Sequence, residues 1–257
     1  MAKAIVQVEN LGLTYGKIRA VQEVSFTVEP GEILAVIGEN GSGKTSSVEC
    51  VEGLRRPDSG TVRVFGLDPW QHRREVYRRM GVQLQETAYP SKIKVEEQCE
   101  LFASFYDRPA DWRLLLSQLG LEEKRKRPIS RLSGGERQRL SILLALMGRP
   151  EILVIDELTT GLDPQVRQSM WASFENIRES GAAILMVSHY LDEVEALADK
   201  ILYLEKGRQL FYGTQQGFRE YVKGRVPEEQ WQEGGTLEKL YLQLAPKAKG
   251  LTIEGIV

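Results

Sequence analysis

A glycine-rich loop, Gly38–Thr45, lies between a short apolar run and a helical pattern, and it restricts the fold more than any other feature. The run Ile33–Ile37 is apolar throughout, which is typical of a strand covered on both faces of a parallel sheet. Ile152–Ile155 and Ala183–Val187 share this pattern. The predicted helices are Lys44–Leu54, Gly134–Met147 and Pro164–Glu179, the last with Asp163 as its N-cap. We therefore expect an α/β fold with a parallel sheet flanked by helices.

The N-terminal part of the chain has a different strand pattern. Val24–Val28 and Thr61–Phe65 alternate apolar and polar residues, as strands with one solvated face do. Such strands usually belong to antiparallel sheets. We expect an antiparallel β subdomain mainly within residues 1–35 and 60–66.

A helix-rich insert, residues 86–131, follows the strand-like segment Gly81–Leu84. Its apolar residues recur at helical spacing, at Leu101, Phe102, Phe105, Leu114, Leu115 and Leu119. We expect an inserted α-helical subdomain over about residues 86–135. Near the end, a glycine pair precedes a predicted last helix, Thr236–Leu244, within a short C-terminal helical tail, residues 226–257.

The glycine-rich loop fits GxxxxGK[ST], the P-loop pattern that binds phosphate groups. Its glycines let backbone N–H groups close around an anion, and the helix N-terminus adds a positive dipole. Lys44 is predicted to reach the outer phosphates of ATP, and Thr45 to offer its hydroxyl to Mg²⁺. Because the pattern arises by chance in only about one chain per hundred of this length, a plain glycine-rich turn is the weaker interpretation. The predicted nucleotide-binding residues here are Gly38, Glu39, Asn40, Gly41, Ser42, Gly43, Lys44, Thr45 and Ser46.

A second signal is the buried run Ile152–Ile155 followed by Asp156 and Glu157. Open α/β sheets bind ligands at the carboxyl ends of their strands. Adjacent strand residues point to opposite faces, so the two acids should have separate roles. We expect Asp156 to hold Mg²⁺ through water and Glu157 to orient and polarise the attacking water. Without the P-loop, a solvated turn would explain the pair equally well.

The segment Leu132–Gln138 distinguishes one P-loop family from the others. Ser133 with Glu136 forms a predicted capping box, and two glycines at a helix start make a second anion-binding N-terminus. With this segment the sequence resembles an ABC ATPase. In that family the segment faces the γ-phosphate held by the P-loop of the opposite subunit. The resemblance thus implies contacts in trans from Ser133, Gly134, Gly135 and Glu136, in a dimer with two ATP at its interface.

The resemblance covers most of the chain, from Tyr15 to His189. It implies that Tyr15 stacks on adenine, although a tyrosine in a turn more often serves packing. It also implies that Gln85 senses Mg²⁺ and the γ-phosphate; Gln83 is a competing assignment two residues earlier. The metal-binding residues implied in total are Thr45, Gln85 and Asp156.

Two later matches concern the dimer and the γ-phosphate. Asp163 ends a segment that resembles the loop through which two subunits touch, although it could serve as an N-cap alone. His189 matches the histidine that contacts the γ-phosphate, which makes Glu157 and His189 the catalytic pair. The sequence departs from the family at Leu158, where many members have proline. Because that position shapes a turn, we expect activity to survive.

The resemblance implies an ATP-hydrolysing subunit, with residues 1–225 as the ABC ATPase domain and ATP and Mg²⁺ as cofactors. Its expected partners are a membrane-spanning permease and a second ATPase subunit, with a homodimer favoured. The amino-acid sequence around Gln85, in Asp156–Asp163 and in Thr236–Leu240 resembles that of the corresponding segments in exporters of drugs, lipids or polysaccharides. We expect a peripheral protein at the cytoplasmic face of the membrane.

Composition narrows the alternatives. The net charge is -2, from 34 basic and 36 acidic residues, so we expect no nucleic acid partner; the basic run Lys124–Arg127 is read as a solvated loop. The two cysteines suggest no disulfide framework, and we find no signal peptide or membrane span. A soluble single-cassette ABC ATPase that drives remodelling or assembly stays open. A kinase or GTPase is less consistent, because it would leave Ser133–Gly135 without a purpose.

Overall fold

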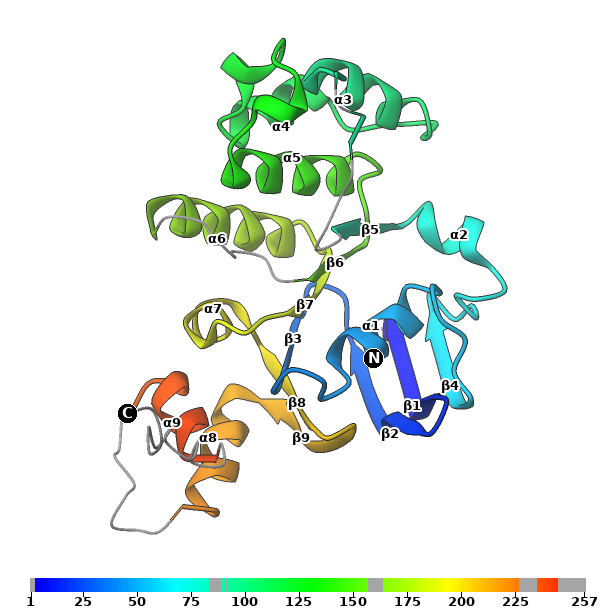
Figure 1. The fold of residues 1–257 in the computed structure, drawn as a ribbon, viewed down its shortest axis with the longest axis vertical. Coiled ribbons are helices and arrows are strands. Elements are labelled where there is room, and N and C mark those ends of the chain that lie inside the picture. The colour runs from blue at the N-terminus through cyan, green and yellow to red at the C-terminus, as the bar shows by residue number, and fades with distance from the viewer. Residues whose placement is uncertain (1–2, 84–88, 91, 157–163, 227–234, 245–257) are drawn as a thin grey trace, which may run out of the picture.

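The computed structural model describes residues 3–83, 89–90, 92–156, 164–226 and 235–244. The molecule is elongated, with the helical insert at one end of its long axis and the C-terminal helices at the other (Figure 1). The sheet lies between them. The predicted α/β architecture is confirmed.

The described strands form one nine-stranded sheet in the order β4-β1-β2-β9-β8-β3-β7-β6-β5. Its parallel part comprises β3 (Ile33–Ile37), β5 (Met80–Gln83), β6 (Ile152–Asp156), β7 (Ala183–Val187) and β8 (Lys200–Glu205). All residues of β3 and β7 are buried, as their apolar runs predict. In register, Asp156 at the end of β6 lies opposite Val187 at the end of β7. The carboxyl ends of these strands therefore meet at one edge.

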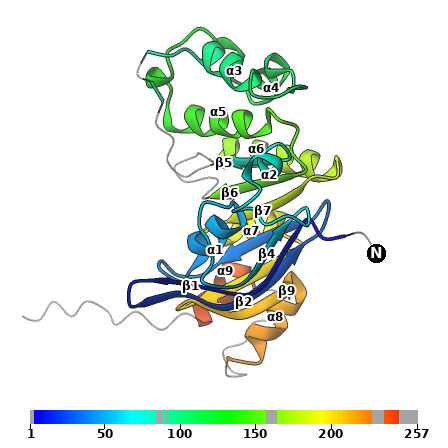
Figure 2. The ribbon, with the colours of Figure 1, turned by 90° about the vertical axis from the view of Figure 1, so that its right-hand side faces the viewer.

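Both predicted antiparallel strands are present: Val24–Val28 is the end of the longer β2 (Ile18–Val28), and Thr61–Phe65 corresponds to β4 (Ser59–Val64), which ends one residue earlier. A third strand, β1 (Val6–Tyr15), was not predicted as a strand and pairs with both. They do not form a separate sheet, because β2 also pairs with β9 (Arg208–Thr214) through Gln22 and Arg208. This single parallel pair joins the antiparallel strands to the main sheet. Figure 2 shows β1, β2 and β4 side by side under α1.

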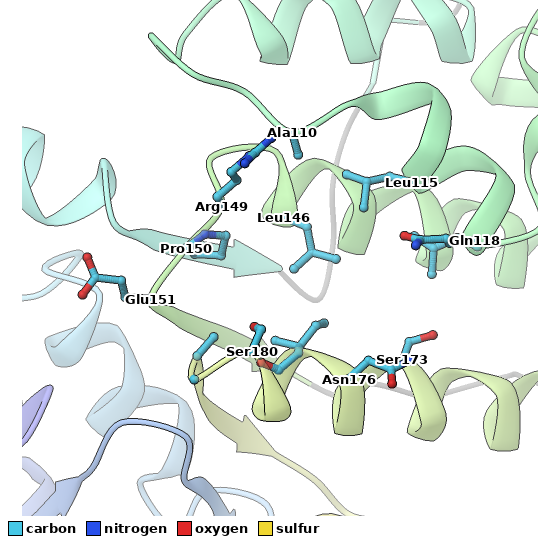
Figure 3. Close-up of a pocket in the computed structure, with 14 residues that line it drawn as sticks. Ala110, Leu115, Gln118, Leu146, Arg149, Pro150, Glu151, Ser173, Asn176 and Ser180 are labelled. Carbon is cyan, nitrogen blue, oxygen red and sulfur yellow. Dashed lines mark hydrogen bonds between the residues drawn. The ribbon is translucent and has the colours of Figure 1, made fainter.

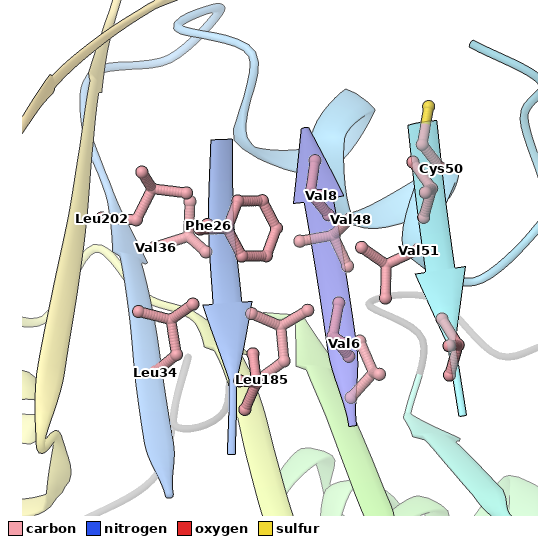
Figure 4. Close-up of a cluster of buried hydrophobic side chains, with 14 of the residues drawn as sticks. Val6, Val8, Phe26, Leu34, Val36, Val48, Cys50, Val51, Leu185 and Leu202 are labelled. Carbon is pink, nitrogen blue, oxygen red and sulfur yellow. The ribbon is translucent and has the colours of Figure 1, made fainter. Parts of the chain in front are cut away.

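Hydrophobic clusters lie on both faces of the sheet, and the two-residue period of β3 divides its side chains between them. Leu34 and Val36 join the cluster with β1, β2 and α1, where Phe26 lies between Val36 and Val8 (Figure 4). Ile33, Ala35 and Ile37 join the cluster that the later helices cover. Both faces of the parallel strands are thus sealed from water.

The first predicted helix begins at the expected residue and ends early. It is α1, Lys44–Val51, whereas the sequence predicted Lys44–Leu54. Gly53 adopts a left-handed φ of 69°, and a Cβ there would lie 2.3 Å from the carbonyl oxygen of Pro69. The chain turns here because the segment around Pro69 packs directly against it.

Three further predicted helices are present with bounds within one residue of those expected: α5 (Gly134–Leu146), α6 (Pro164–Glu179) and α9 (Leu237–Leu244). The sequence analysis did not predict α2 (Arg73–Tyr77), α7 (Leu191–Leu197) or α8 (Gln215–Lys223). The predicted N-cap of α6, Asp163, lies outside the described residues. Among the described residues, no helix is long and apolar enough to cross a membrane.

The insert contains α3 (Val95–Ala103) and α4 (Trp112–Gln118), which pack with α5 around a hydrophobic cluster of their own. Phe102, Leu115 and Leu119 contribute to this cluster. Leu101, Phe105 and Leu114 are exposed, although their spacing matched the same helices. Phe105 lies beyond the end of α3, so the helical period no longer sets its direction. The insert therefore presents apolar side chains to its surroundings.

Candidate functional site

A cavity of about 760 Å³ lies where the carboxyl ends of β3 and β7 meet the first helix. It brings together most of the predicted nucleotide residues. Its lining comprises Tyr15, Ile18, Arg19, Ala20, Asn40, Gly41, Gly43, Lys44, Thr45, Ser46, Val187, His189 and Lys206. Segments far apart in the sequence thus share one hollow, at the edge of the sheet where α/β proteins bind ligands.

The P-loop needs glycine at two close approaches. Gly38 and Gly43 have φ of 147° and 100°, in the range that other residues rarely adopt. A Cβ at Gly38 would lie 2.2 Å from the carbonyl oxygen of Leu204, and one at Gly43 would lie 2.5 Å from that of Ala20. Because backbone fills the space on both sides, these glycines hold the loop against β8 and β2.

Lys44 is 5% exposed and folds back over the loop. Its Nζ donates to the carbonyl oxygens of Gly38 and Glu39, at 2.8 Å each. The ammonium group is therefore held at the centre of the loop, where an arriving phosphate would meet it.

Tyr15 forms one wall of the cavity. The residue is 38% exposed, and its hydroxyl lies 3.3 Å from Ser46 Oγ. The guanidinium of Arg55 lies 4.8 Å from the ring centroid and pairs with Glu49 at 2.6 Å. An aromatic ring fixed in this way, yet still accessible, suits stacking of a planar base.

Asp156 and His189 approach the cavity from neighbouring strands. Asp156 ends β6, opposite Val187 of the lining, and His189 follows β7 by two residues. Glu52, just after α1, is buried and interacts electrostatically with Asp156. Burial raises the pKa of Glu52 to about 8, and the negative charge of Asp156 adds to this effect. The buried position of Glu52 therefore favours its protonated form at neutral pH.

Ser133–Glu136 forms the predicted capping box at the start of α5. Ser133 Oγ accepts from the N–H of Glu136 at 3.2 Å, and Glu136 Oε2 accepts from the N–H of Ser133 at 2.8 Å. This segment is absent from the described lining of the P-loop cavity. A Cβ at Gly134 would meet no atom within 4 Å, so the helix start faces open space.

The basic run Lys124–Arg127 is more structured than the solvated loop predicted. Lys124 forms an ion pair with Glu136 at 2.9 Å, and Arg125 pairs with Glu96 at 3.0 Å. The hydrogen bond from Lys124, followed by that from the Ser133 backbone, holds the pKa of Glu136 below its usual range. The insert thereby fixes the capping carboxylate of α5.

Three predicted site residues, Gln85, Glu157 and Asp163, lie outside the described residues. The competing glutamine, Gln83, is the last residue of β5 and is buried. Gln83 is not among the described lining residues of the P-loop cavity.

The cavity also contains residues that the sequence analysis missed, in particular Ile18, Arg19 and Lys206. Lys206 is in the turn between β8 and β9 and has a φ of 49°. The Lys206–Gly207 dipeptide between two strand patterns signals a hairpin. Its position beside the P-loop follows from contacts far apart in sequence: the N–H of Gly207 donates to the carbonyl of Ser42 at 3.1 Å.

A second cavity, of about 680 Å³, lies between the insert and the core. Figure 3 shows Leu115 and Leu146 facing Ser173 and Asn176 across it. It contains none of the predicted site residues. We assign no chemistry to it.

Comparison with known proteins agrees with this arrangement. The profile of the ABC transporter family matches residues 21–160. Nod factor export ATP-binding protein I of Ralstonia nicotianae is 33% identical over 256 residues, which cover 98% of this chain and 79% of that protein. Doxorubicin resistance ATP-binding protein DrrA of Mycobacterium tuberculosis is 35% identical over 219 residues, covering 81% of this chain and 65% of that protein.

Solved structures agree as well. The ATP-binding subunit of an ABC transporter superposes with a TM-score of 0.83 at 26% identity, covering 93% of this chain and 99% of that one. A dimeric bacterial ABC transporter cassette has a TM-score of 0.74 at 23% identity, covering 81% and 98%, and shows the same fold. The chain belongs to the ABC transporter family, in which it is an ATP-binding subunit with ATPase activity.

Proposed function

We propose that two copies of this chain close around two Mg-ATP and that this closure drives a separate membrane permease, in the export direction. One observation carries the proposal: the P-loop and the start of α5 belong to different surfaces of one chain. Asn40, Gly41 and Gly43–Thr45 of the P-loop line the cavity, whereas Ser133–Glu136 is absent from its described lining and faces open space at Gly134. An anion-binding helix start without a nucleotide in its own chain can meet one bound to a second copy.

ATP binding is assigned to the cavity of the first copy. Tyr15 stacks on adenine, and the P-loop surrounds the phosphates. Lys44 turns from the carbonyls of Gly38 and Glu39 to the phosphate oxygens, which are stronger acceptors because they are charged. The second copy adds Ser133, Gly134, Gly135 and Glu136, and Asp163 contributes to the contact between subunits.

The residues near the phosphates suit Mg²⁺. This ion prefers oxygen ligands and keeps several waters, so it needs few protein groups. Thr45 lines the cavity and Asp156 ends the strand beside it. We assign the ion to Thr45, Asp156 and Gln85; when bound, it neutralises charge on the phosphate oxygens.

Hydrolysis is assigned to Glu157 and His189. Glu157 orients a water and accepts its proton as the oxygen bonds to the γ-phosphorus. The bond between the γ-phosphorus and the bridging oxygen breaks, giving ADP and phosphate. Lys44 and His189 stabilise the charge on the transferred group. Loss of the γ-phosphate removes the contact to Ser133–Glu136 of the other copy and lets the dimer open.

The transport role rests on two observations. The two relatives described above are named as an export ATP-binding protein and a drug-resistance ATP-binding protein. The insert also exposes Leu101, Phe105 and Leu114, apolar side chains that a contact with a permease would remove from water. We assign this subdomain, with residues 85–91, to the contact with a permease at the cytoplasmic face of the membrane.

A complementation experiment tests the composite site. Lys44→Ala disables the P-loop, and Ser133→Arg disables the start of α5. Each variant alone should lose ATPase activity. A mixture should recover activity, because a mixed dimer contains one site with an intact P-loop from one copy and an intact Ser133 from the other. If the mixture stays inactive while both variants fold, the site does not form between copies.

Membrane association separates transport from the alternative, a soluble ABC ATPase that drives assembly. The tagged chain should fractionate with membranes and copurify with a multi-span protein. Replacing Phe105 and Leu114 by serine should release it from the membrane and leave basal ATPase activity in place. Recovery of the unaltered chain only from the soluble fraction would contradict the transport role.

A further inference from the structure

We propose that Glu193 is a positioning residue for His189, acting through the hydroxyl of Ser188. The inference rests on the proposed role of His189 at the γ-phosphate. It concerns a buried carboxyl group that the proposed reaction does not use.

The turn that carries His189 is fixed on both sides of this residue by one hydroxyl group. Ser188 Oγ donates to Glu193 Oε2 at 2.7 Å and accepts from the N–H of Tyr190 at 3.0 Å. Ser188 is 1% exposed and Glu193 is fully buried, so water does not compete for these bonds. Glu193 on α7 thus holds Ser188, and Ser188 in turn holds Tyr190, so that the residues before and after His189 are connected.

Backbone bonds connect the same turn to the core. The N–H of Ser188 donates to the carbonyl of Val36 at 3.4 Å, next to the P-loop, and the N–H of Val194 donates to that of Tyr190 at 3.3 Å. His189 lies between these anchors and lines the nucleotide cavity. A shift of α7 relative to β7 would therefore move the imidazole relative to the phosphates.

The charged groups around Glu193 lie on the outer side of the turn. Asp192 Oδ1 accepts from the N–H of Glu193 at 3.0 Å, and Asp192 Oδ2 accepts from Arg167 at 2.7 Å. The guanidinium of Arg167 lies 5.0 Å from the ring centroid of Tyr190. Burial raises the pKa of Glu193 to about 7, opposed by the Ser188 hydrogen bond. In either protonation state the carboxyl group has an oxygen that can accept from Ser188.

Burying the Glu193 carboxyl group at this position costs desolvation free energy. Its neighbours Leu191, Val194 and Leu197 belong to the apolar cluster under α7, where an aliphatic side chain would avoid the desolvation penalty. A leucine could not supply the acceptor at 2.7 Å, and it would leave the Ser188 hydroxyl only the longer contact to the carbonyl oxygen of Tyr190, at 3.3 Å. This difference between the two side chains is the basis of the test.

The variants are Glu193→Gln, which keeps an acceptor oxygen, and Glu193→Leu, which removes it. Glu195→Gln on the same helix is the matched control, because Glu195 pairs outward with Arg219. We expect Glu193→Leu to lower kcat about tenfold and the ATP affinity less than about twofold, since a misplaced group affects the transition state more than binding. Glu193→Gln and Glu195→Gln should keep most of the activity.

A spectroscopic readout reports on His189 directly. The chain has only two histidines, so the ring signals of His189 and His72 can be resolved in a ¹H–¹³C spectrum of histidine-labelled protein. In Glu193→Leu the His189 cross-peak should shift or broaden, while that of His72 stays in place. An unchanged His189 cross-peak in a folded Glu193→Leu protein would overturn the inference.

The His189→Ala variant distinguishes this inference from the proposed function. If His189→Ala keeps the wild-type kcat, the role of His189 fails, whatever the spectrum of Glu193→Leu shows. If His189→Ala is impaired, adding Glu193→Leu should cost little more, because the second change acts through the residue already removed. Losses that multiply in the double variant would show that Glu193 acts independently of His189.

Discussion

Lys124 Nζ lies 2.9 Å from Glu136 Oε1, and this ion pair links the insert to the start of α5. Glu136 caps the helix whose N-terminus is assigned to the second ATP. The side chains are 26% and 15% exposed, so the pair is only partly screened by water. The insert therefore holds the capping carboxylate of α5 through an ion pair, in addition to the apolar cluster that it shares with this helix.

The capping carboxylate predicts a pH dependence of stability. The pKa of Glu136 is lowered in the folded protein, so its stabilisation is present above the ordinary pKa of a glutamate, about 4.3, and is lost as pH falls through the lower folded value. Urea unfolding should show the wild type more stable than Glu136→Gln at pH 7. The difference should shrink below about pH 4. A constant difference down to pH 3 would contradict the lowered pKa.

Two glycines of the P-loop should differ in their tolerance of alanine. Gly41 and Gly43 both have positive φ, so alanine costs roughly 1–2 kcal/mol of backbone strain at either. Only Gly43 is also close to backbone, 2.5 Å from the carbonyl oxygen of Ala20, whereas a Cβ at Gly41 would meet nothing within 4 Å. Gly43→Ala should lower the free energy of unfolding clearly more than Gly41→Ala. Equal losses in denaturant titrations would argue against the close approach of β2.

Tyr15 should contribute to ATP affinity through its ring. Tyr15→Ala should weaken ATP binding by about 1–3 kcal/mol, the usual contribution of base stacking on an aromatic side chain. Tyr15→Phe keeps the ring and loses only the 3.3 Å contact to Ser46, so its affinity should stay close to wild type. Titration with a fluorescent ATP analogue measures both. Similar losses in the two variants would assign the effect to the hydroxyl group.

Glu157→Gln should separate ATP binding from hydrolysis. Loss of a positioned acid–base group slows turnover by about 10² to 10⁴ and leaves the phosphate contacts intact. The variant should therefore accumulate as an ATP-bound dimer, measurable by size-exclusion chromatography with light scattering. Addition of Ser133→Arg in the same chain should prevent that dimer. Normal ATP turnover by Glu157→Gln would refute the role of Glu157.

The sequence by itself determined the local elements of this protein. Ile33–Ile37 is a buried strand because a continuous apolar run suits a sheet covered on both faces, and Gly38–Thr45 follows it with a complete phosphate-binding pattern. Ser133 and Glu136 formed the predicted capping box, because the bonds that define it span only three residues. Signals of this kind depend only on residues that are close together in the chain, so the sequence alone is enough to predict them.

Tertiary structure alone decided which distant segments meet. Lys206 reaches the P-loop cavity because β8 pairs with β3, and Arg19 because β2 lies beside β9. The Lys124–Glu136 pair and the exposure of Phe105 likewise follow from how the insert packs. These contacts depend on the order of the strands in the sheet and on the burial of two apolar clusters. Both result from interactions among residues throughout the chain. No local pattern in the sequence encodes them, so the places of Arg19 and Lys206 in the P-loop cavity became visible only in the folded molecule.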